Sequence, residues 1–129
     1  MKINRFEDLN IWKLALKLTR NIYDLTSKKE FSHDFELKNQ IKGAAISISS
    51  NIVEGFEKNN NNEFIRFLKI AKGSAGEVRS QLYLALNVKQ ITNEEFKKAH
   101  DDILTLLSRI GSLIKYLETQ RKLGHFKTR

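Results

Sequence analysis

The strongest structural signal in this chain is QIKGAAISISSNIVEG, residues Gln40–Gly55. At helical spacing, one side of this region is apolar and carries Leu37, Ile41, Ala44, Ala45, Ile48 and Ile52. Ile46 and Val53, seven residues apart, lie on roughly the opposite side of the same helix. A helix that is apolar on two faces needs burial on both. Because a chain of 129 residues has few elements to cover the second face, we expect another subunit to cover it.

The composition is that of a soluble globular protein. Hydrophobic residues make up 40% of the chain and charged residues 29%, and the absence of proline permits long helices. No apolar run is long enough to span a bilayer, and the start, MKINRFEDLNIW, has acidic residues where a signal peptide needs an apolar core. We therefore expect a cytoplasmic protein that does not bind membranes.

The apolar periodicity predicts four helices in one domain, residues 1–129. The helices are expected over residues 9–27, 34–55, 63–87 and 93–121. Gly55 is expected to cap the second helix, and Thr92 with Glu95 forms a capping-box pattern that opens the fourth. Residues 28–33 read as a polar turn and residues 123–129 as a short, loose, basic tail. The predicted fold class is all-α, an antiparallel up-down four-helix bundle.

Apolar side chains remain after one core is filled. These candidates for an oligomer interface are Trp12, Leu16, Tyr23, Ile46, Val53, Ile65, Ile70, Tyr83 and Leu84. Singly, each is explained as an ordinary surface residue or part of a wider core, but together they favour oligomerisation. Gly73 and Gly76 lie opposite the core, and a glycine inside a helix costs about 1 kcal/mol relative to alanine. They indicate either a closely packed neighbour or tolerated local weakness.

The chain is strongly basic, with 23 Lys and Arg against 15 Asp and Glu, a formal net charge of +8. This excess fits nucleic acid, an acidic partner or an anionic surface, or serves solubility, and charge alone does not choose between these. The candidates for nucleic-acid contact are Lys13, Lys17, Arg20, Arg66, Lys69, Lys72, Arg79, Arg121 and Lys122. Each basic ridge is also explained as a solvated helix face. Together they indicate salt-sensitive, sequence-tolerant phosphate contact.

No pattern of catalytic residues is evident, so we expect no enzyme, cofactor or metal. His33, His100 and His125 are scattered, and the paired carboxylates Glu94–Glu95 and Asp101–Asp102 diverge around the helix. A partly buried, hydrogen-bonded role fits His100 better than a catalytic one. Asn51 and Glu54, one turn apart, fit a structural role.

Three segments resemble the four-helix-bundle family encoded within intervening sequences of bacterial 23S ribosomal RNA. They are FEDLNIWKLALKL at Phe6–Leu18, QIKGAAISISSNIVEG at Gln40–Gly55 and EFIRFLKIAKGSAGEVRSQLYLA at Glu63–Ala85. The elements around Asn51, Glu54 and Gly55 and around Gly73 carry the likeness, whereas Ser49 stands where the family commonly has proline. The family includes the accessory variability determinant of diversity-generating retroelements. The resemblance implies a homopentameric ring, a basic surface that engages nucleic acid and, in the retroelement branch, a reverse transcriptase partner.

These observations favour a non-enzymatic homo-oligomer that binds the RNA or DNA backbone as an accessory or scaffold protein. The alternative is a protein–protein adaptor whose charge serves solubility.

Overall fold

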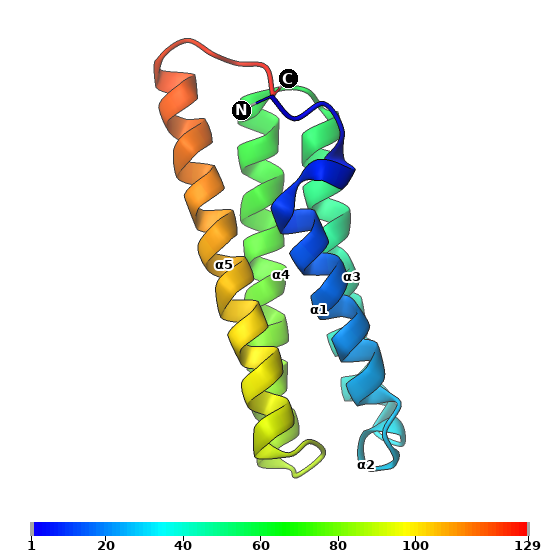
Figure 1. The fold of residues 1–129 in the computed structure, drawn as a ribbon. Helices are drawn as coiled ribbons and strands as arrows, with labels where there is room; N and C mark the ends of the chain where they lie inside the picture. The colour runs from blue at the N-terminus through cyan, green and yellow to red at the C-terminus, as the bar shows by residue number, and fades with distance from the viewer. Residues whose placement is uncertain (1, 129) are drawn as a thin grey trace.

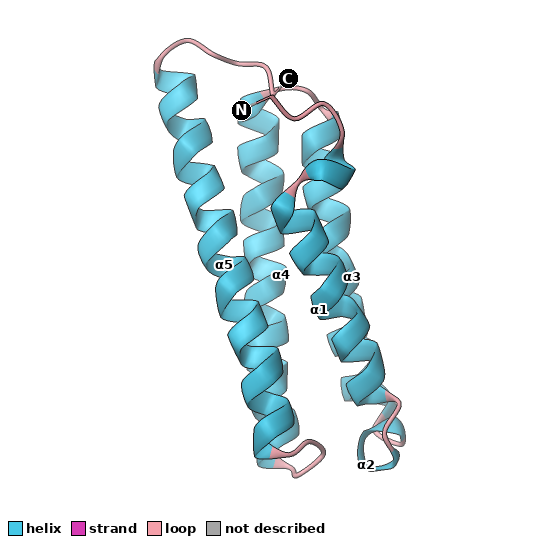
Figure 2. Ribbon diagram, viewed as in Figure 1, coloured by secondary structure: helices cyan, strands magenta, loops and turns pink. Residues whose placement is uncertain are grey.

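The computed structural model describes residues 2–128, and these residues contain helices and loops but no strand (Figure 2). The elements, with η1 a short 3-10 helix, are η1 (Phe6–Asp8), α1 (Asn10–Thr26), α2 (Lys29–Ser32), α3 (Phe35–Glu57), α4 (Asn61–Asn87) and α5 (Asn93–Lys122). The predicted all-α class with four long helices is therefore confirmed. Figure 1 shows these helices side by side, with the chain reversing direction between successive ones and both ends of the chain at the same end of the bundle.

The long helices α3, α4 and α5 begin where a polar side chain satisfies the first free backbone N–H groups. Asp34 accepts from the Leu37 N–H, and Asn60 accepts from the Glu63 N–H, both at 3.1 Å. The Thr92 hydroxyl accepts from the Glu95 N–H while the Glu95 carboxylate accepts from the Thr92 N–H, so the predicted capping box is present.

The core is formed by the apolar stripes that the periodicity predicts. All six side chains of the α3 stripe are buried, as are most residues of the stripes on α1, α4 and α5. Helix α3 packs between α1 and α4, and α5 packs against α4 and α1, so the four stripes meet in one core.

Gly55 does not end its helix, contrary to the prediction. Helix α3 continues to Glu57, and Gly55 is buried against the start of α4. A Cβ atom at Gly55 would lie 2.6 Å from Phe67 Cβ and 3.1 Å from Phe64 Cδ1. Glycine at this position therefore permits close approach of two helices rather than a helix end.

The segment predicted as a polar turn contains a further helical turn, α2. Its Phe31 is fully buried in the core. The polar residues around Phe31 in the sequence do not indicate this burial. Ile65 is a second correction, because this predicted interface residue is 3% exposed and belongs to the core.

The predicted loose tail is held in place from His125 to Thr128. Helix α5 ends in a Schellman motif, in which Gly124 at φ +87° turns the chain back and the His125 N–H donates to the Gln120 carbonyl. The Asn61 side chain then donates to the His125 carbonyl at 2.8 Å, and the Asn61 N–H donates to the Phe126 carbonyl. The tail thus closes over the start of α4, while its last residue, 129, lies outside the described residues.

Candidate nucleic-acid and subunit interfaces

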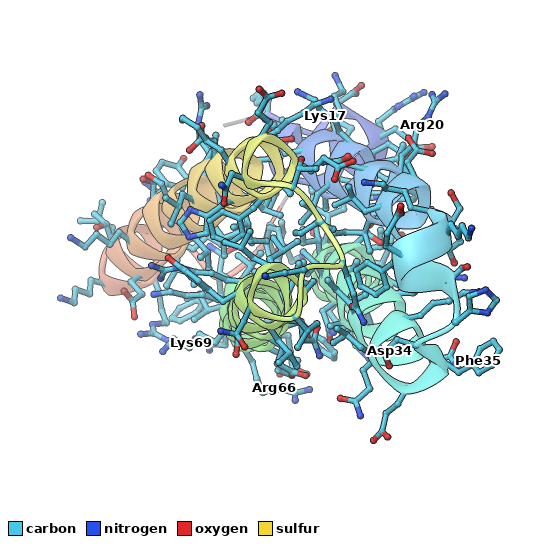
Figure 3. The ribbon with its side chains drawn as sticks, turned by 90° about the horizontal axis from the view of Figure 1, so that it is seen from below. Lys17, Arg20, Asp34, Phe35, Arg66 and Lys69 are labelled. Carbon is cyan, nitrogen blue, oxygen red and sulfur yellow. The ribbon has the colours of Figure 1, made fainter. Side chains whose placement is uncertain are left out.

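The predicted basic residues are divided between two sides of the bundle. Figure 3, which looks along the helices, shows Lys17 and Arg20 of α1 on one side and Arg66 and Lys69 of α4 on the other. The structure therefore does not gather all nine candidates into one surface. Each side has to be judged by its own surroundings.

A basic groove runs along α4 and α5, which we call the α4–α5 groove. Two hollows of about 500 and 550 Å³ form it, and Lys72 lines both. The cations that line the groove are Lys69, Lys72 and Arg79 from α4 and Lys115 from α5. Lys69 and Arg79 are ten residues apart, so the α4 cations span about 15 Å at 1.5 Å per residue.

Glycines leave helix backbone exposed along this groove. Gly76 and Gly111 line it, and Gly73 lies one turn from Gly76 on α4. Apart from the backbone of its own helix and its chain neighbours, no described heavy atom lies within 4 Å of where a Cβ would stand at any of the three. No close neighbour from the described part of the same subunit packs against Gly73 and Gly76, so a ligand or another chain can approach the backbone here.

The groove keeps most of its positive charge. Lys69 Nζ is 4.0 Å from Glu118 Oε2, the carboxylate in the groove wall. Arg79 Nε donates to His100 Nε2 at 3.3 Å, so its partner is an imidazole rather than an acid. The partly buried, hydrogen-bonded state predicted for His100 matches this geometry. Because Arg79 has no carboxylate partner in this contact, its charge remains available.

An aromatic cluster closes one end of the groove. The ring of His100 stacks on Phe96 with centroids 5.0 Å apart, and Tyr83 meets both rings at an angle. Tyr83 itself lines the groove and is half exposed, which places it beside Arg79.

Three other basic candidates lie outside the groove. Arg66 forms two hydrogen bonds with the Glu63 carboxylate, at 3.0 and 3.3 Å, and its guanidinium lies 4.5 Å from the centre of the Phe67 ring. The hydrogen bond from Arg66 holds the pKa of Glu63 below its ordinary value, so the two charges offset each other. Arg121 donates to Asn62 Oδ1 at 3.1 Å near the tail, and Lys122 is exposed at the end of α5.

One of the three α1 candidates lies near an acidic side chain. Lys13, Lys17 and Arg20 are exposed, and Lys17 Nζ is 4.0 Å from Asp102 Oδ1 of α5. Their arrangement fits a solvated helix face.

Five of the predicted interface residues lie on α1 and α3, two helices that pack against each other. These residues, which we call the α1–α3 face, are Trp12, Leu16, Tyr23, Ile46 and Val53. Leu16 is 52% exposed and Ile46 44% exposed, whereas Trp12 and Val53 line a shallow hollow of about 600 Å³. The Lys42 ammonium lies 4.3 Å from the centre of the Tyr23 ring, which joins the two helices at the surface.

The remaining interface candidates are on α4. Ile70 and Leu84 are each more than 40% exposed, and Tyr83 belongs to the α4–α5 groove. They do not belong to the α1–α3 face, because they lie on a different helix.

Asn51 supports a hydrogen bond between Ser47 and Ser74 that ties α3 to α4. Asn51 Nδ2 donates to the Ser47 carbonyl at 2.8 Å and to Ser47 Oγ at 3.0 Å. Ser47 Oγ in turn lies 2.9 Å from Ser74 Oγ of α4, next to Gly73. Glu54 is exposed and lines the hollow beside Trp12. This geometry supports a structural role for Asn51 within one subunit.

Sequence reasoning missed Lys115 and Gly111, the α5 contribution to the groove. Their helix is long and its basic residues are spread around it, so the sequence offers no signal until α5 is placed against α4. Within residues 2–128, no group of three or more His, Cys, Asp or Glu side chains is arranged to hold a metal ion. None of the helices described is both long and apolar enough to cross a membrane.

Comparison with known proteins identifies relatives of the whole bundle. A crystal structure of a protein with unknown function from the S23 ribosomal protein family of Bacteroides thetaiotaomicron VPI-5482 is 25% identical to this chain. The match covers 81% of this chain and 98% of that one, with a TM-score of 0.75. None of the curated proteins matches the chain. The sequence profile of the 23S rRNA-intervening sequence proteins matches residues 7–112, which include α1 to α4 and most of α5, and the chain therefore belongs to the 23S rRNA-intervening sequence protein family.

Proposed function

We propose that this protein is a non-enzymatic, antiparallel up-down four-helix bundle that forms a homo-oligomer and binds the RNA or DNA backbone through the α4–α5 groove. The observation that carries the proposal is the combination of four cations with open helix backbone in one groove. The cations are Lys69, Lys72, Arg79 and Lys115.

Phosphate binding suits this groove better than base recognition. Lysine and arginine neutralise phosphates and release counterions, which gives affinity without sequence preference. The exposed backbone at Gly73 and Gly76 lets a sugar-phosphate strand approach α4 more closely than a side chain would allow. Tyr83 adds one half-exposed ring at the end of the groove, too few aromatic groups for a stacking platform.

Assembly through the α1–α3 face leaves the groove free. The two surfaces are formed by different pairs of helices, so copies of the chain can cover Leu16 and Ile46 while Lys72 and Arg79 stay exposed. The family resemblance implies a homopentamer, in which five copies at +8 each carry a formal charge of +40. Such a ring would present the groove repeatedly to one nucleic acid, as an accessory protein of an RNA element or of a reverse transcriptase in the cytoplasm.

The groove is tested by two matched double variants that remove the same charge from opposite sides of the bundle. Lys72→Gln with Arg79→Gln alters the groove, and Lys13→Gln with Arg20→Gln alters α1. We expect the groove variant to weaken binding of a labelled RNA by about tenfold or more in fluorescence anisotropy, since two charge-assisted contacts are lost. The α1 variant should bind within about twofold of the unaltered protein. Equal losses in both variants would show that net charge, not the groove, governs binding.

Assembly is tested by light scattering. One chain has a mass of 15.0 kDa, and we expect a multiple of that mass for the unaltered protein. Leu16→Lys with Ile46→Lys should shift the mass toward one chain, whereas Val88→Lys with Leu104→Lys, at equally exposed apolar residues outside the candidates, should not. A mass of one chain at all concentrations would remove the assembly claim.

The α1–α3 face also supports a second function, an adaptor that binds another protein. A half-exposed apolar face beside a shallow hollow is typical of protein interfaces. The adaptor function is favoured over nucleic-acid binding if the protein binds neither RNA nor DNA at about 50 mM salt, a low salt concentration at which contacts with the phosphate backbone are strong.

A further inference from the structure

A separate cavity lies where the two ends of the chain meet. It has a volume of about 470 Å³, is open to solvent on one side, and is lined by the segment around Lys2, the start of α4, the last turns of α5 and the tail. This size lies within the range of about 300–1,000 Å³ typical of small-molecule sites. We propose that the cavity binds a nucleoside monophosphate, either as a free nucleotide or as the 5′-phosphorylated end of an RNA strand.

The charge of the cavity favours an anion. Lys2, His125 and Lys127 line it, and no acidic side chain from residues 2–128 does. Two lysines and a histidine in one cavity lining suit a terminal phosphate, which carries more charge than a phosphate within a strand. The cavity therefore favours the end of a strand, whereas the α4–α5 groove is proposed to bind phosphates within a strand.

Two buried polar side chains in the wall lack partners for their oxygens. Asn61 is 2% exposed, and its amide donates to the His125 carbonyl while Oδ1 has no partner among the described residues. Thr128 is 6% exposed, and its Oγ1 is likewise without a partner in residues 2–128. Buried oxygens without hydrogen bonds are costly. A ribose supplies hydroxyls that can donate to Asn61 Oδ1 and accept from the Thr128 hydroxyl.

Engagement of these oxygens involves the tail. Both atoms are shielded in the structure, so a ligand that reaches them must displace the segment His125–Thr128 slightly. That segment is held to α4 by two hydrogen bonds from Asn61. Tyr116, 39% exposed in the same wall, offers a ring on which a base can stack.

The strand-end form of this proposal rests on the proposed nucleic-acid function, whereas the free-nucleotide form does not. The test uses two probes. The first is 5′-AMP, titrated in a calorimeter. The second is a short RNA with either a 5′-phosphate or a 5′-hydroxyl, followed by fluorescence anisotropy.

The variants are Lys127→Gln and Thr128→Val, with Lys115→Gln in the α4–α5 groove as the matched control. For either source of the ligand, we expect Lys127→Gln to weaken binding about fivefold or more, the effect of losing one charge-assisted hydrogen bond. Thr128→Val should weaken it about threefold, and Lys115→Gln should leave 5′-AMP binding unchanged. Saturable binding of 5′-AMP supports the free nucleotide. A preference for phosphorylated RNA that Lys127→Gln abolishes, without 5′-AMP binding, supports the strand end.

The proposal is overturned if 5′-AMP does not bind and the two RNAs bind equally, or if Lys127→Gln and Thr128→Val change neither affinity. Binding of 5′-hydroxyl RNA that depends on Lys115 would then still support the groove. Conversely, if the protein binds 5′-AMP but no RNA, the nucleotide site in the cavity is supported and the proposed nucleic-acid function is refuted.

Discussion

Gly55 and Gly76 should respond to the same substitution in opposite directions. At Gly55 the new Cβ of alanine would stand 2.6 Å from Phe67 Cβ, about 1 Å closer than a favourable carbon–carbon contact. Overpacking of this kind costs about 1–3 kcal/mol, and the better helix propensity of alanine offsets about 1 kcal/mol of it. Because Phe67 Cβ is fixed to the backbone of α4 and cannot swing away, we expect the upper part of this range, about 2–3 kcal/mol, and therefore a net loss of about 1–2 kcal/mol.

At Gly76 the structure leaves open space, so the Cβ of alanine would meet no described atom within 4 Å beyond its chain neighbours and its own helix backbone. Gly76→Ala should therefore stabilise the chain by about 0.5–1 kcal/mol through helix propensity alone. Urea denaturation followed by far-UV circular dichroism, at one protein concentration, measures both changes in the free energy of unfolding. Equal gains in stability for the two variants would refute the close approach of α3 and α4 at Gly55.

Further predictions concern the core, the turns and the acid response. Ile65→Ala should lower the free energy of unfolding by about 2–5 kcal/mol, whereas Ile70→Ala should change it by less than about 0.5 kcal/mol in a single subunit. Equal effects of the two substitutions in urea denaturation would place Ile65 at the surface. Lys89 lies at φ +62° in the Schellman turn after α4, so Lys89→Gly should raise the free energy of unfolding by about 0.5–1 kcal/mol. A lower melting temperature in thermal denaturation would argue against that turn. Burial raises the pKa of Glu95, but the hydrogen bonds from Lys28 and Thr92 outweigh it and hold the pKa below the ordinary 4.5. The Lys28–Glu95 contribution is therefore fully present above about pH 4.5 and is lost as the pH falls through the lowered pKa. Glu95→Gln should cost about 1 kcal/mol at pH 7 and flatten the acid dependence of stability, and an unchanged acid profile would contradict this assignment.

Much of the fold follows from local sequence signals. The three- and four-residue spacing of apolar residues places the long helices within a few residues, and the side chains of Asp34 and Thr92 mark two of their starts. These signals are local because helix formation and capping depend on neighbours in the chain.

The errors all arise where distant segments meet. Gly55 has the chemistry of a helix end, and only its contact with α4 shows that it serves packing. Phe31 stands among polar residues, and burial comes from helices far along the chain. The tail looks unstructured in sequence, yet Asn61, more than sixty residues earlier, holds it.

The candidate site shows the same limit. The sequence names Lys69, Lys72 and Arg79 but cannot separate them from the equally basic stretch of α1, because the groove exists only once α5 contributes Lys115. Periodicity does, however, identify the apolar α1–α3 face, since both of its helices carry a second apolar stripe of their own.

The salt dependence of RNA binding tests the role of the α4–α5 groove most directly. For single strands, each phosphate contact contributes about 0.7 to the slope of log K against log salt. Loss of the phosphate contacts proposed for Lys72 and Arg79 should therefore make the negative slope shallower by about 1.4, while Lys13→Gln with Arg20→Gln leaves it unchanged. An unaltered slope in the groove variant, or an equally shallower slope in the α1 variant, would contradict the assignment of the groove as the phosphate-binding surface.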